Sequence, residues 1–193
     1  MARPRLIFPL IAFLVSLIIL GVAWFAFDPM GETGSSAIGG PFQLTAQDGR
    51  SVTEKDLRGG PSLVFFGFTH CPDVCPTALY EIGLIYKAMG EDGDRLKTFF
   101  VTVDPERDTP SVIKDYLSGF DARITGLSGA PDAVLAAEKA YRAYAKKVPL
   151  ETGGYTMDHT ALIYLMDGKG RFLSSLNIDR SPEENAKMIS KYF

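Results

Sequence analysis

The hydrophobic pattern of the chain alternates between short, nearly continuous apolar runs and longer segments whose apolar residues recur at helical spacing. Residues 61–68 (PSLVFFGF) and 96–104 (LKTFFVTVD) are apolar runs, and they predict strands buried on both faces. Residues 76–89 and 109–120 carry apolar side chains three or four positions apart, which predicts helices. Both helical segments have a proline at or next to their first residue, a position that proline tolerates well.

The same alternation continues to the C-terminus. Residues 123–129 predict a short strand and the Ala-rich segment 131–148 predicts a helix. Residues 160–177 predict two strands joined by a glycine-containing turn, and residues 181–193 predict a closing helix capped by Ser181. The order β-α-β-α-β-α-ββ-α favours an α/β fold with a central, mainly parallel sheet, an antiparallel hairpin at one side and helices on its faces.

The N-terminal region has a different pattern. Residues 6–27 contain no charged residue and are long enough to cross a bilayer, which takes about 20 apolar residues in a helix. Arg3 and Arg5 precede this run and the next basic residue is Arg50, so residues 1–5 are expected in the cytoplasm and the remainder outside it. The alternative is a cleaved secretory signal, but the apolar core of such a signal is normally only about 7 to 15 residues long.

We therefore expect a single-pass anchor at residues 6–27, a flexible Gly/Ser-containing tether at residues 28–40 and one domain at residues 41–193. The domain would be periplasmic on an inner (cytoplasmic) membrane, or attached to the mitochondrial inner membrane in a eukaryote. The chain has a formal net charge of −3, and without Arg3 and Arg5 the charge is about −5. A nucleic-acid partner is not expected, because no basic stripe is present to contact phosphates.

Both cysteines of the chain lie in one short stretch, GFTHCPDVCPT, beside one of its two histidines. Cys71 follows the first predicted strand and Cys75 comes just before the helix expected to begin near Pro76, at the kind of junction where open α/β sheets bind ligands. The positive end of the helix favours the thiolate form there. The two sulfurs could form a disulfide or bind one metal ion. A purely structural disulfide is the weaker interpretation, since so short a loop gains little stability from closure.

The second histidine, His159, stands in YTMDHTALIYL, just before the predicted hairpin. We expect this segment to cross the sheet edge near the first helix, so that His159 meets Cys71 and Cys75. Asp158 could orient the imidazole or repel a wrong partner, although it could equally be an ordinary turn residue. Met157 is a further soft side chain close to His159.

Zinc is the competing metal, because two Cys and two His make a closed tetrahedral set if His70 joins. His70 is adjacent to Cys71, however, and neighbouring residues rarely reach one ion without strain, so we expect His70 to shield the site. Asp104 ends the second buried strand in VTVDPERDTP and should lie at the same sheet edge, together with Glu106, Arg107 and Asp108. For Asp108 we favour a role in capping the next helix, and Asp104 is left as a docking or supporting residue.

The three motifs GFTHCPDVCPT, VTVDPERDTP and YTMDHTALIYL, in this order behind an N-terminal apolar segment, resemble the Sco/SenC family of copper-binding proteins that serve cytochrome c oxidase assembly. The resemblance implies a thioredoxin-like fold and one copper ion, Cu(I) or Cu(II), held by Cys71, Cys75 and His159. Two thiolates and an imidazole are a soft ligand set suited to Cu(I).

The resemblance further implies a membrane-anchored copper chaperone that delivers its ion to the binuclear copper centre of cytochrome c oxidase subunit II, after loading by an unidentified copper donor. The alternative is a thiol-disulfide oxidoreductase that reduces the copper-ligand cysteines of the oxidase or another exported substrate. Cys71 and Cys75 would then be the redox pair, kept reduced by an unidentified thiol reductant. A peroxidase on the same fold is not favoured, because the paired spacing does not resemble an isolated reactive thiolate.

Overall fold

The computed structural model describes residues 13–17, 20 and 38–193. The chain divides into two compact units, Met1–Ser35 and Ser36–Phe193. In the first unit, the described residues 13–17 and 20 are helical. The predicted anchor at 6–27 and tether at 28–40 lie mostly outside the described residues. Among the helices that are described, none is both long enough and apolar enough to cross a membrane.

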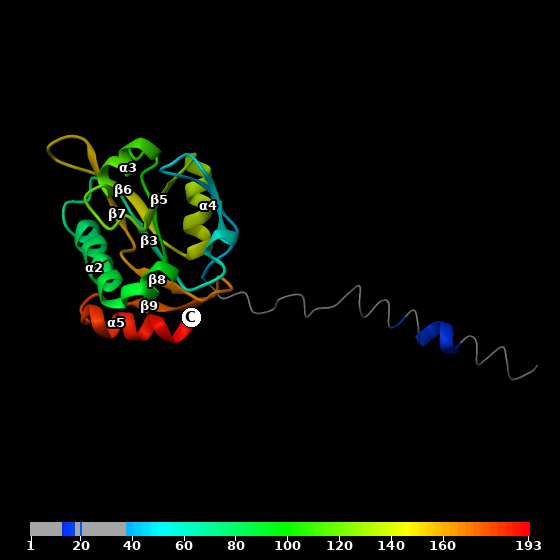
Figure 1. The fold of residues 1–193 in the computed structure, drawn as a ribbon. Helices are drawn as coiled ribbons and strands as arrows, with labels where there is room; N and C mark the ends of the chain where they lie inside the picture. Colours follow the sequence, from blue (N-terminus) through cyan, green and yellow to red (C-terminus); the bar gives the residue numbers. More distant parts are fainter. Residues whose placement is uncertain (1–12, 18–19, 21–37) are drawn as a thin grey trace, which may run out of the picture. The chain divides into compact units, whose positions relative to one another are not determined.

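The second unit is built around a seven-stranded sheet (Figure 1). In spatial order its strands are β2 (Ser51–Thr53), β1 (Gln43–Ala46), β5 (Ile124–Ser128), β4 (Lys97–Thr102), β3 (Ser62–Gly67), β8 (Ile163–Met166) and β9 (Phe172–Leu176). The central strands β3, β4 and β5 are parallel, and every other neighbouring pair is antiparallel. The parallel centre and the C-terminal hairpin were predicted. The β1–β2 hairpin was not, because its strands are too short to show a periodic pattern.

Four helices of the second unit accompany the sheet: α2 (Val74–Met89), α3 (Pro110–Leu117), α4 (Pro131–Tyr141) and α5 (Pro182–Ile189). Short 3-10 segments occupy η1 (Glu54–Leu57), η2 (Gly90–Arg95) and η3 (Ser190–Tyr192). The predicted capping of α5 is confirmed, since Ser181 and Glu184 form a reciprocal capping box. Thr109 caps α3, with its side chain accepting a hydrogen bond from Val112 N at 3.4 Å.

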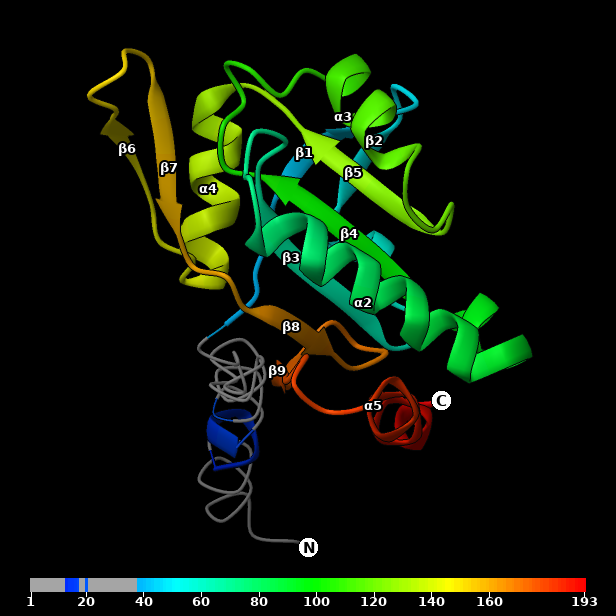
Figure 2. The same ribbon diagram turned by 90° about the vertical axis from the view of Figure 1, so that its left-hand side faces the viewer.

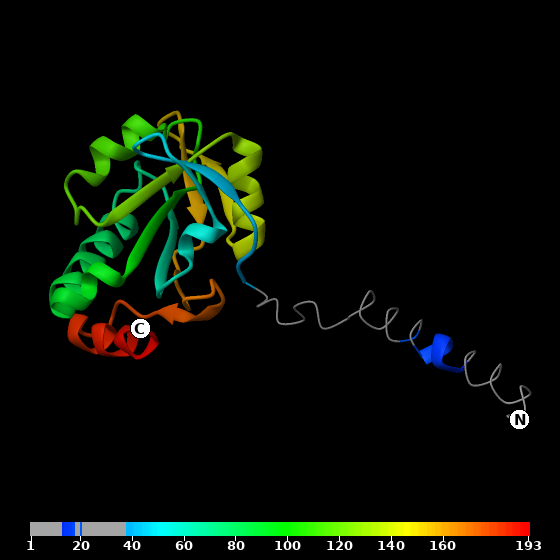
Figure 3. The same ribbon diagram turned by 45° about the vertical axis from the view of Figure 1, so that its right-hand side comes forward.

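Strand β3 is buried on both faces because helices cover each of them (Figures 1 and 3). On one face Phe65 contacts Phe100, which in turn contacts Tyr116 of α3. On the other face Phe66 contacts Tyr141 of α4, with ring centroids 5.4 Å apart. Each such fully buried aromatic ring contributes roughly 1.5–3 kcal/mol to folding, so β3 is a firmly held strand. The loop that carries the cysteines leaves its carboxyl end.

The predicted helix over 131–148 is wrong beyond Tyr141. Arg142 adopts a left-handed backbone conformation with φ of 53°, and Ala143 N donates to Glu138 O at 2.9 Å, which ends the helix. The following residues form β6 (Ala145–Pro149), which pairs antiparallel with β7 (Tyr155–His159) in a separate two-stranded sheet. Figure 2 shows this hairpin beside α4. The hairpin brings His159, the last residue of β7, toward the main sheet.

Candidate metal site

The cysteine loop connects β3 to α2. The helix begins at Val74, two residues earlier than expected, so Cys75 lies in its first turn. Cys71 is held in the loop by its N–H, which donates to Phe68 O at 3.2 Å, while Cys75 N donates to Cys71 Sγ at 3.4 Å. Both thiols are free, Cys75 is fully buried and Cys71 is partly exposed. Cys71 is therefore the more accessible of the two residues.

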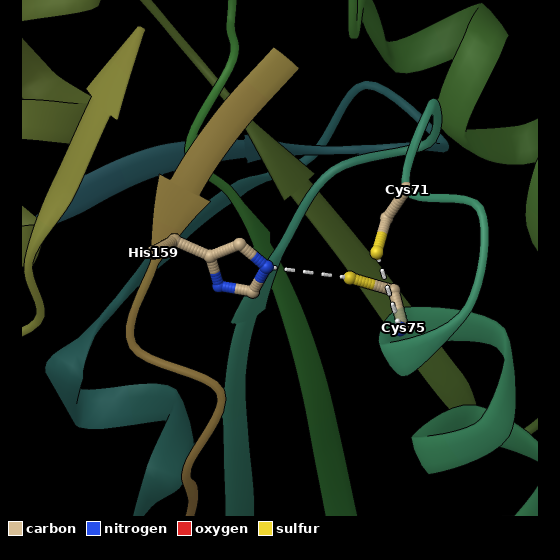
Figure 4. A group of neighbouring side chains, drawn as sticks. All are labelled: Cys71, Cys75 and His159. Carbon is tan, nitrogen blue, oxygen red and sulfur yellow. Dashed lines mark hydrogen bonds between the residues drawn. The ribbon is translucent and has the colours of Figure 1, made fainter. Parts of the chain in front are cut away.

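The side chains of Cys71, Cys75 and His159 point toward one another (Figure 4). Their ligand atoms all lie within 4.8 Å of one another, and Cys75 Sγ is 3.6 Å from His159 Nε2. The cysteines come from the start of α2 and the histidine from the end of β7, on the segment that leads into β8. The expected convergence of these three residues is observed.

The imidazole of His159 is oriented by a hydrogen bond to the backbone of the next residue. Its Nδ1 lies 3.1 Å from the carbonyl oxygen of Thr160, which can only accept a hydrogen bond, so the proton of the neutral ring is on Nδ1. The lone pair of Nε2 then faces the sulfurs. Asp158 does not provide this orientation, because it is exposed and adjacent residues of a strand face opposite sides. Phe68 holds the ring edge-on, with centroids 5.6 Å apart and planes at 90°.

Gly67, at the end of β3, makes room for the buried sulfur. A β-carbon at this position would lie 2.9 Å from Cys75 Sγ and 2.7 Å from Phe100 Cε2, closer than side chains approach one another. The absence of a side chain at Gly67 therefore allows Cys75 Sγ to pack directly against the strand.

Burial raises the pKa of the Cys75 thiol, and the neighbouring Cys71 raises it further. The expectation that the helix start favours the thiolate is therefore wrong for Cys75, because burial penalises the charged form of the thiol and raises its pKa. At neutral pH the free chain holds a neutral Cys75 thiol. A soft cation entering the site must displace this proton.

His70 lies outside the group formed by the two cysteines and His159. Its ring is about half exposed, and its Nδ1 is 3.1 Å from Thr69 Oγ1 and 3.9 Å from Asp108 Oδ1. Within the described ranges, the metal-ligand group therefore contains three residues, and the structure does not bring His70 into it as a fourth.

Asp108 is a supporting residue whose role the sequence analysis assigned wrongly. It does not cap α3, since Thr109 does so. Its buried carboxylate accepts hydrogen bonds from Thr69 N at 3.0 Å, Thr69 Oγ1 at 2.6 Å and Thr102 Oγ1 at 2.7 Å. Asp108 thereby ties the cysteine loop to the end of β4. One indication of this contact was present in the sequence: the cysteine loop and the loop that contains Asp108 each follow a predicted parallel strand, so both lie at the same edge of the sheet.

Asp104 is also buried at this edge, and its contacts are with Arg107 and Tyr155. Its carboxylate accepts from Arg107 Nε and from the Tyr155 hydroxyl, the latter at 2.9 Å. Arg107 Nη1 also donates to Tyr155 O at 3.0 Å. Asp104 is therefore linked to the start of the strand that carries His159.

Two chemistries are open to this arrangement. Two sulfurs and one imidazole nitrogen form a soft donor set with an unfilled position, which suits binding and release of a soft metal ion. Two neighbouring thiols, one accessible and one buried, also suit exchange with a disulfide.

The order of strands and helices, with a cysteine pair where the first parallel strand meets its helix, defines a thioredoxin-like protein whose cysteine site also contains a histidine. The chain belongs to the SCO1/SenC family, whose sequence profile matches residues 30–193.

Individual relatives agree with this assignment. The chain is 42% identical over 146 residues to Protein SCO1, mitochondrial, of Saccharomyces cerevisiae, covering 74% of this chain and 50% of that protein. It is 38% identical over 157 residues to Protein SenC of Rhodobacter capsulatus, covering 81% and 71% respectively. The solved structure of Bradyrhizobium japonicum ScoI with copper bound has 58% identity and a TM-score of 0.79, covering 81% of this chain and all of that one. The chain spans about half the length of the mitochondrial relatives from Arabidopsis and yeast.

Proposed function

We propose that this protein binds one copper ion through Cys71, Cys75 and His159 and delivers it to the binuclear copper centre of cytochrome c oxidase subunit II. The observation that carries the proposal is the convergence of three soft ligand atoms within 4.8 Å on a chain of the SCO1/SenC family. The solved structure of a relative with copper bound and 58% identity supports the choice of metal. Copper is the cargo of this protein, and its passage to the oxidase follows from the family resemblance.

The donor set explains why copper is preferred to zinc. Thiolate and imidazole bind both metals, but zinc in a structural site takes four protein ligands, and the group found in the described part of the chain has three. Three ligands leave a position on the ion for a ligand from a partner. Release would proceed by ligand exchange, in which the partner's ligands replace those of this chain one at a time.

In this proposal residues 6–27 anchor the protein in the inner membrane and residues 41–193 form the copper-binding domain on its outer side. Anchoring restricts the domain to the membrane that contains the oxidase. An unidentified donor supplies the copper and an unidentified thiol reductant keeps Cys71 and Cys75 reduced, because a disulfide between them cannot bind the ion in this way.

A Cu(I) titration of the reduced full chain against a competing chelator tests the proposal. We expect tight one-to-one binding that is strongly weakened by Cys71→Ala and by His159→Ala. The variant His70→Ala should bind copper as the wild type does, because His70 lies outside the ligand group. Weak binding by the wild type, or binding indifferent to His159→Ala, would contradict the three-ligand site.

Thiol-disulfide exchange is a second candidate function, favoured by the contrast between the accessible Cys71 and the buried Cys75. The Cys71 thiolate would attack a substrate disulfide, releasing one substrate sulfur as a thiolate that takes up a proton. The Cys75 sulfur, after losing its proton, would attack Cys71 and release the second substrate thiol. The substrate gains two electrons and the chain retains a Cys71–Cys75 disulfide.

Oxidase assembly in cells that carry His159→Ala separates the two functions. A purely redox role predicts that this variant retains most of its assembly function at limiting copper, because the imidazole takes no part in the exchange. Copper delivery predicts that His159→Ala fails as completely as Cys71→Ala. Failure of the histidine variant alongside full reductase activity in vitro would exclude a purely redox role.

A further inference from the structure

Arg107 contacts the start of the strand that carries His159 and, less closely, the aromatic ring that packs on His159. At the start of β7, Arg107 Nη1 donates to Tyr155 O at 3.0 Å, and its guanidinium lies over the Tyr155 ring at 3.9 Å from the centroid. The same guanidinium is 5.9 Å from the centroid of Phe68, whose ring packs edge-on against the imidazole of His159. One side chain therefore contacts Tyr155 closely and also lies near Phe68, the ring that supports the imidazole.

The geometry of β7 makes the first of these contacts relevant to the metal site. Successive side chains of a strand alternate between its faces, so Tyr155 and His159 lie on the same face. A rotation or shift of the strand that moves Tyr155 therefore moves His159 with it. In the described part of the chain, β6 and β7 pair only with each other, so strand pairing with the main sheet does not fix the position of this hairpin.

The loop after β4 supplies the side chains that fix it instead. Asp104 accepts hydrogen bonds from Arg107 Nε and from the Tyr155 hydroxyl, joining the two residues through one buried carboxylate. From the same loop, Glu106 pairs with Lys147 of β6 at 2.5 Å, and the Lys147 ammonium lies 4.7 Å from the Tyr155 ring centroid. Both strands of the hairpin are thus tied to residues 104–107.

In the described part of the chain, one nitrogen of the Arg107 guanidinium lacks a hydrogen-bond partner. This atom, Nη2, is buried. A buried donor without a partner lowers stability, and such an atom calls for an explanation other than stability. The guanidinium lies 3.9 Å from the centroid of the Tyr155 ring and 5.9 Å from that of Phe68, and we attribute its placement to these two rings.

We propose that Arg107 is a positioning residue for the metal site, which sets the place of His159 through Tyr155 on one side and Phe68 on the other. The inference rests on the proposed copper-binding function. It assigns Arg107 no direct contact with the ion. Its role is to hold the imidazole, the one ligand that comes from outside the cysteine loop, within reach of the sulfurs.

A double-mutant cycle on the full chain tests this proposal. Cu(I) affinity is measured by competition with a chelator for the wild type, Arg107→Gln, His159→Ala and the double variant. Loss of a residue that orients a ligand typically lowers metal affinity 10- to 100-fold, and we expect a loss of about tenfold for Arg107→Gln. In the His159→Ala background the same change should lower the affinity less than about twofold, because Arg107 acts through the imidazole.

The chain offers a matched control in Arg123. This residue also stacks on a tyrosine, at 4.1 Å from the Tyr86 ring centroid, and pairs with an aspartate, Asp121, at 2.7 Å. It belongs to a different part of the fold, so Arg123→Gln should lose comparable contacts without changing copper affinity. Arg107→Lys, which keeps the charge but loses the planar fork, should recover only part of the affinity and serves if Arg107→Gln does not fold.

A second readout needs no metal. Amide hydrogen exchange over residues 155–159 of the copper-free chain should become faster in Arg107→Gln and stay unchanged in Arg123→Gln. Unchanged copper affinity in Arg107→Gln, or an equal loss in both backgrounds of the cycle, would overturn the proposal. These outcomes are distinct from failure of the proposed function, in which the wild type itself does not bind Cu(I) tightly.

Discussion

Replacing Gly67 by alanine should damage the site without touching any ligand. The added β-carbon would lie 2.9 Å from Cys75 Sγ and 2.7 Å from Phe100 Cε2, whereas such atoms prefer separations of about 3.5–4.0 Å. Relief of the overlap requires a displacement of roughly 1 Å, shared between the sulfur and the ring. The Phe100 ring is fully buried and packed against Phe65 and Tyr116, so we expect the sulfur to take much of the shift.

Two losses should follow from this displacement. Overpacking of a full core costs about 1–3 kcal/mol in the free energy of unfolding, which urea denaturation would measure. Binding sites also need their groups held within about 0.5 Å, so a sulfur displaced from its 3.6 Å contact with His159 Nε2 should weaken Cu(I) binding. The chelator competition described above measures that loss.

Gly83→Ala is the matched control for Gly67→Ala. Gly83 lies inside α2, and a β-carbon there would find its nearest neighbour at 3.8 Å, so the substitution fits without strain. It should stabilise the protein by about 0.5–1 kcal/mol and leave copper affinity unchanged. The reasoning fails if Gly67→Ala retains both wild-type stability and wild-type affinity.

Three further predictions concern the rest of the domain. Burial raises the pKa of Glu138 to about 7 from its usual 4.5, so the folded state binds the extra proton and stability falls as pH rises from about 4.5 to 7. Glu138→Gln should therefore raise the urea unfolding free energy at pH 8 by up to about 3 kcal/mol and change it little near pH 5. An equal difference between variant and wild type at both pH values would contradict the raised pKa of Glu138. Asp108→Asn replaces one acceptor oxygen by an NH₂ group, so the buried donors of Thr69 and Thr102 lose part of their hydrogen bonding. It should lower the urea unfolding free energy by about 2–4 kcal/mol. A loss under about 1 kcal/mol would contradict its anchoring role. Tyr86→Phe removes a buried hydroxyl that donates to Leu96 O and shares a second hydrogen bond with Thr98 Oγ1. It should cost about 1 kcal/mol, and unchanged thermal stability would show that these bonds do not contribute.

The central part of the fold could be predicted because its signal is local and repeated. The buried strands β3 and β4 are nearly continuous apolar runs, and α2 shows clear helical spacing. The β6 strand could not be predicted, since an Ala- and Lys-rich segment has a helical composition and becomes a strand only by pairing with β7. The end of α4 depends on the left-handed conformation of Arg142, which no local sequence rule requires.

The sequence allowed the three ligand residues to be predicted, but not the pKa of the Cys75 thiol or the contact between Tyr155 and Arg107. The convergence of Cys71, Cys75 and His159 was expected from residue type and position, the family resemblance implied that they bind copper, and the convergence is observed. The pKa of the Cys75 thiol could not be predicted from its place at a helix start, because the burial that raises it is a property of the assembled core. Tyr155 was missed altogether, since nothing in the sequence around it indicates a contact with Arg107, which lies 48 residues away in the chain.

The three converging atoms come from two places in the chain, with Cys75 and His159 separated by 84 residues. An ion held by all of them acts as a removable cross-link that closes this long loop. In the chain-entropy description, a permanent link across a loop of that size limits the unfolded ensemble by an amount on the order of 4 kcal/mol. Binding of the ion should therefore raise the thermal stability of the domain. In the delivery proposed above, departure of the imidazole alone would open the loop, while the two sulfurs at the start of α2 would still hold the ion.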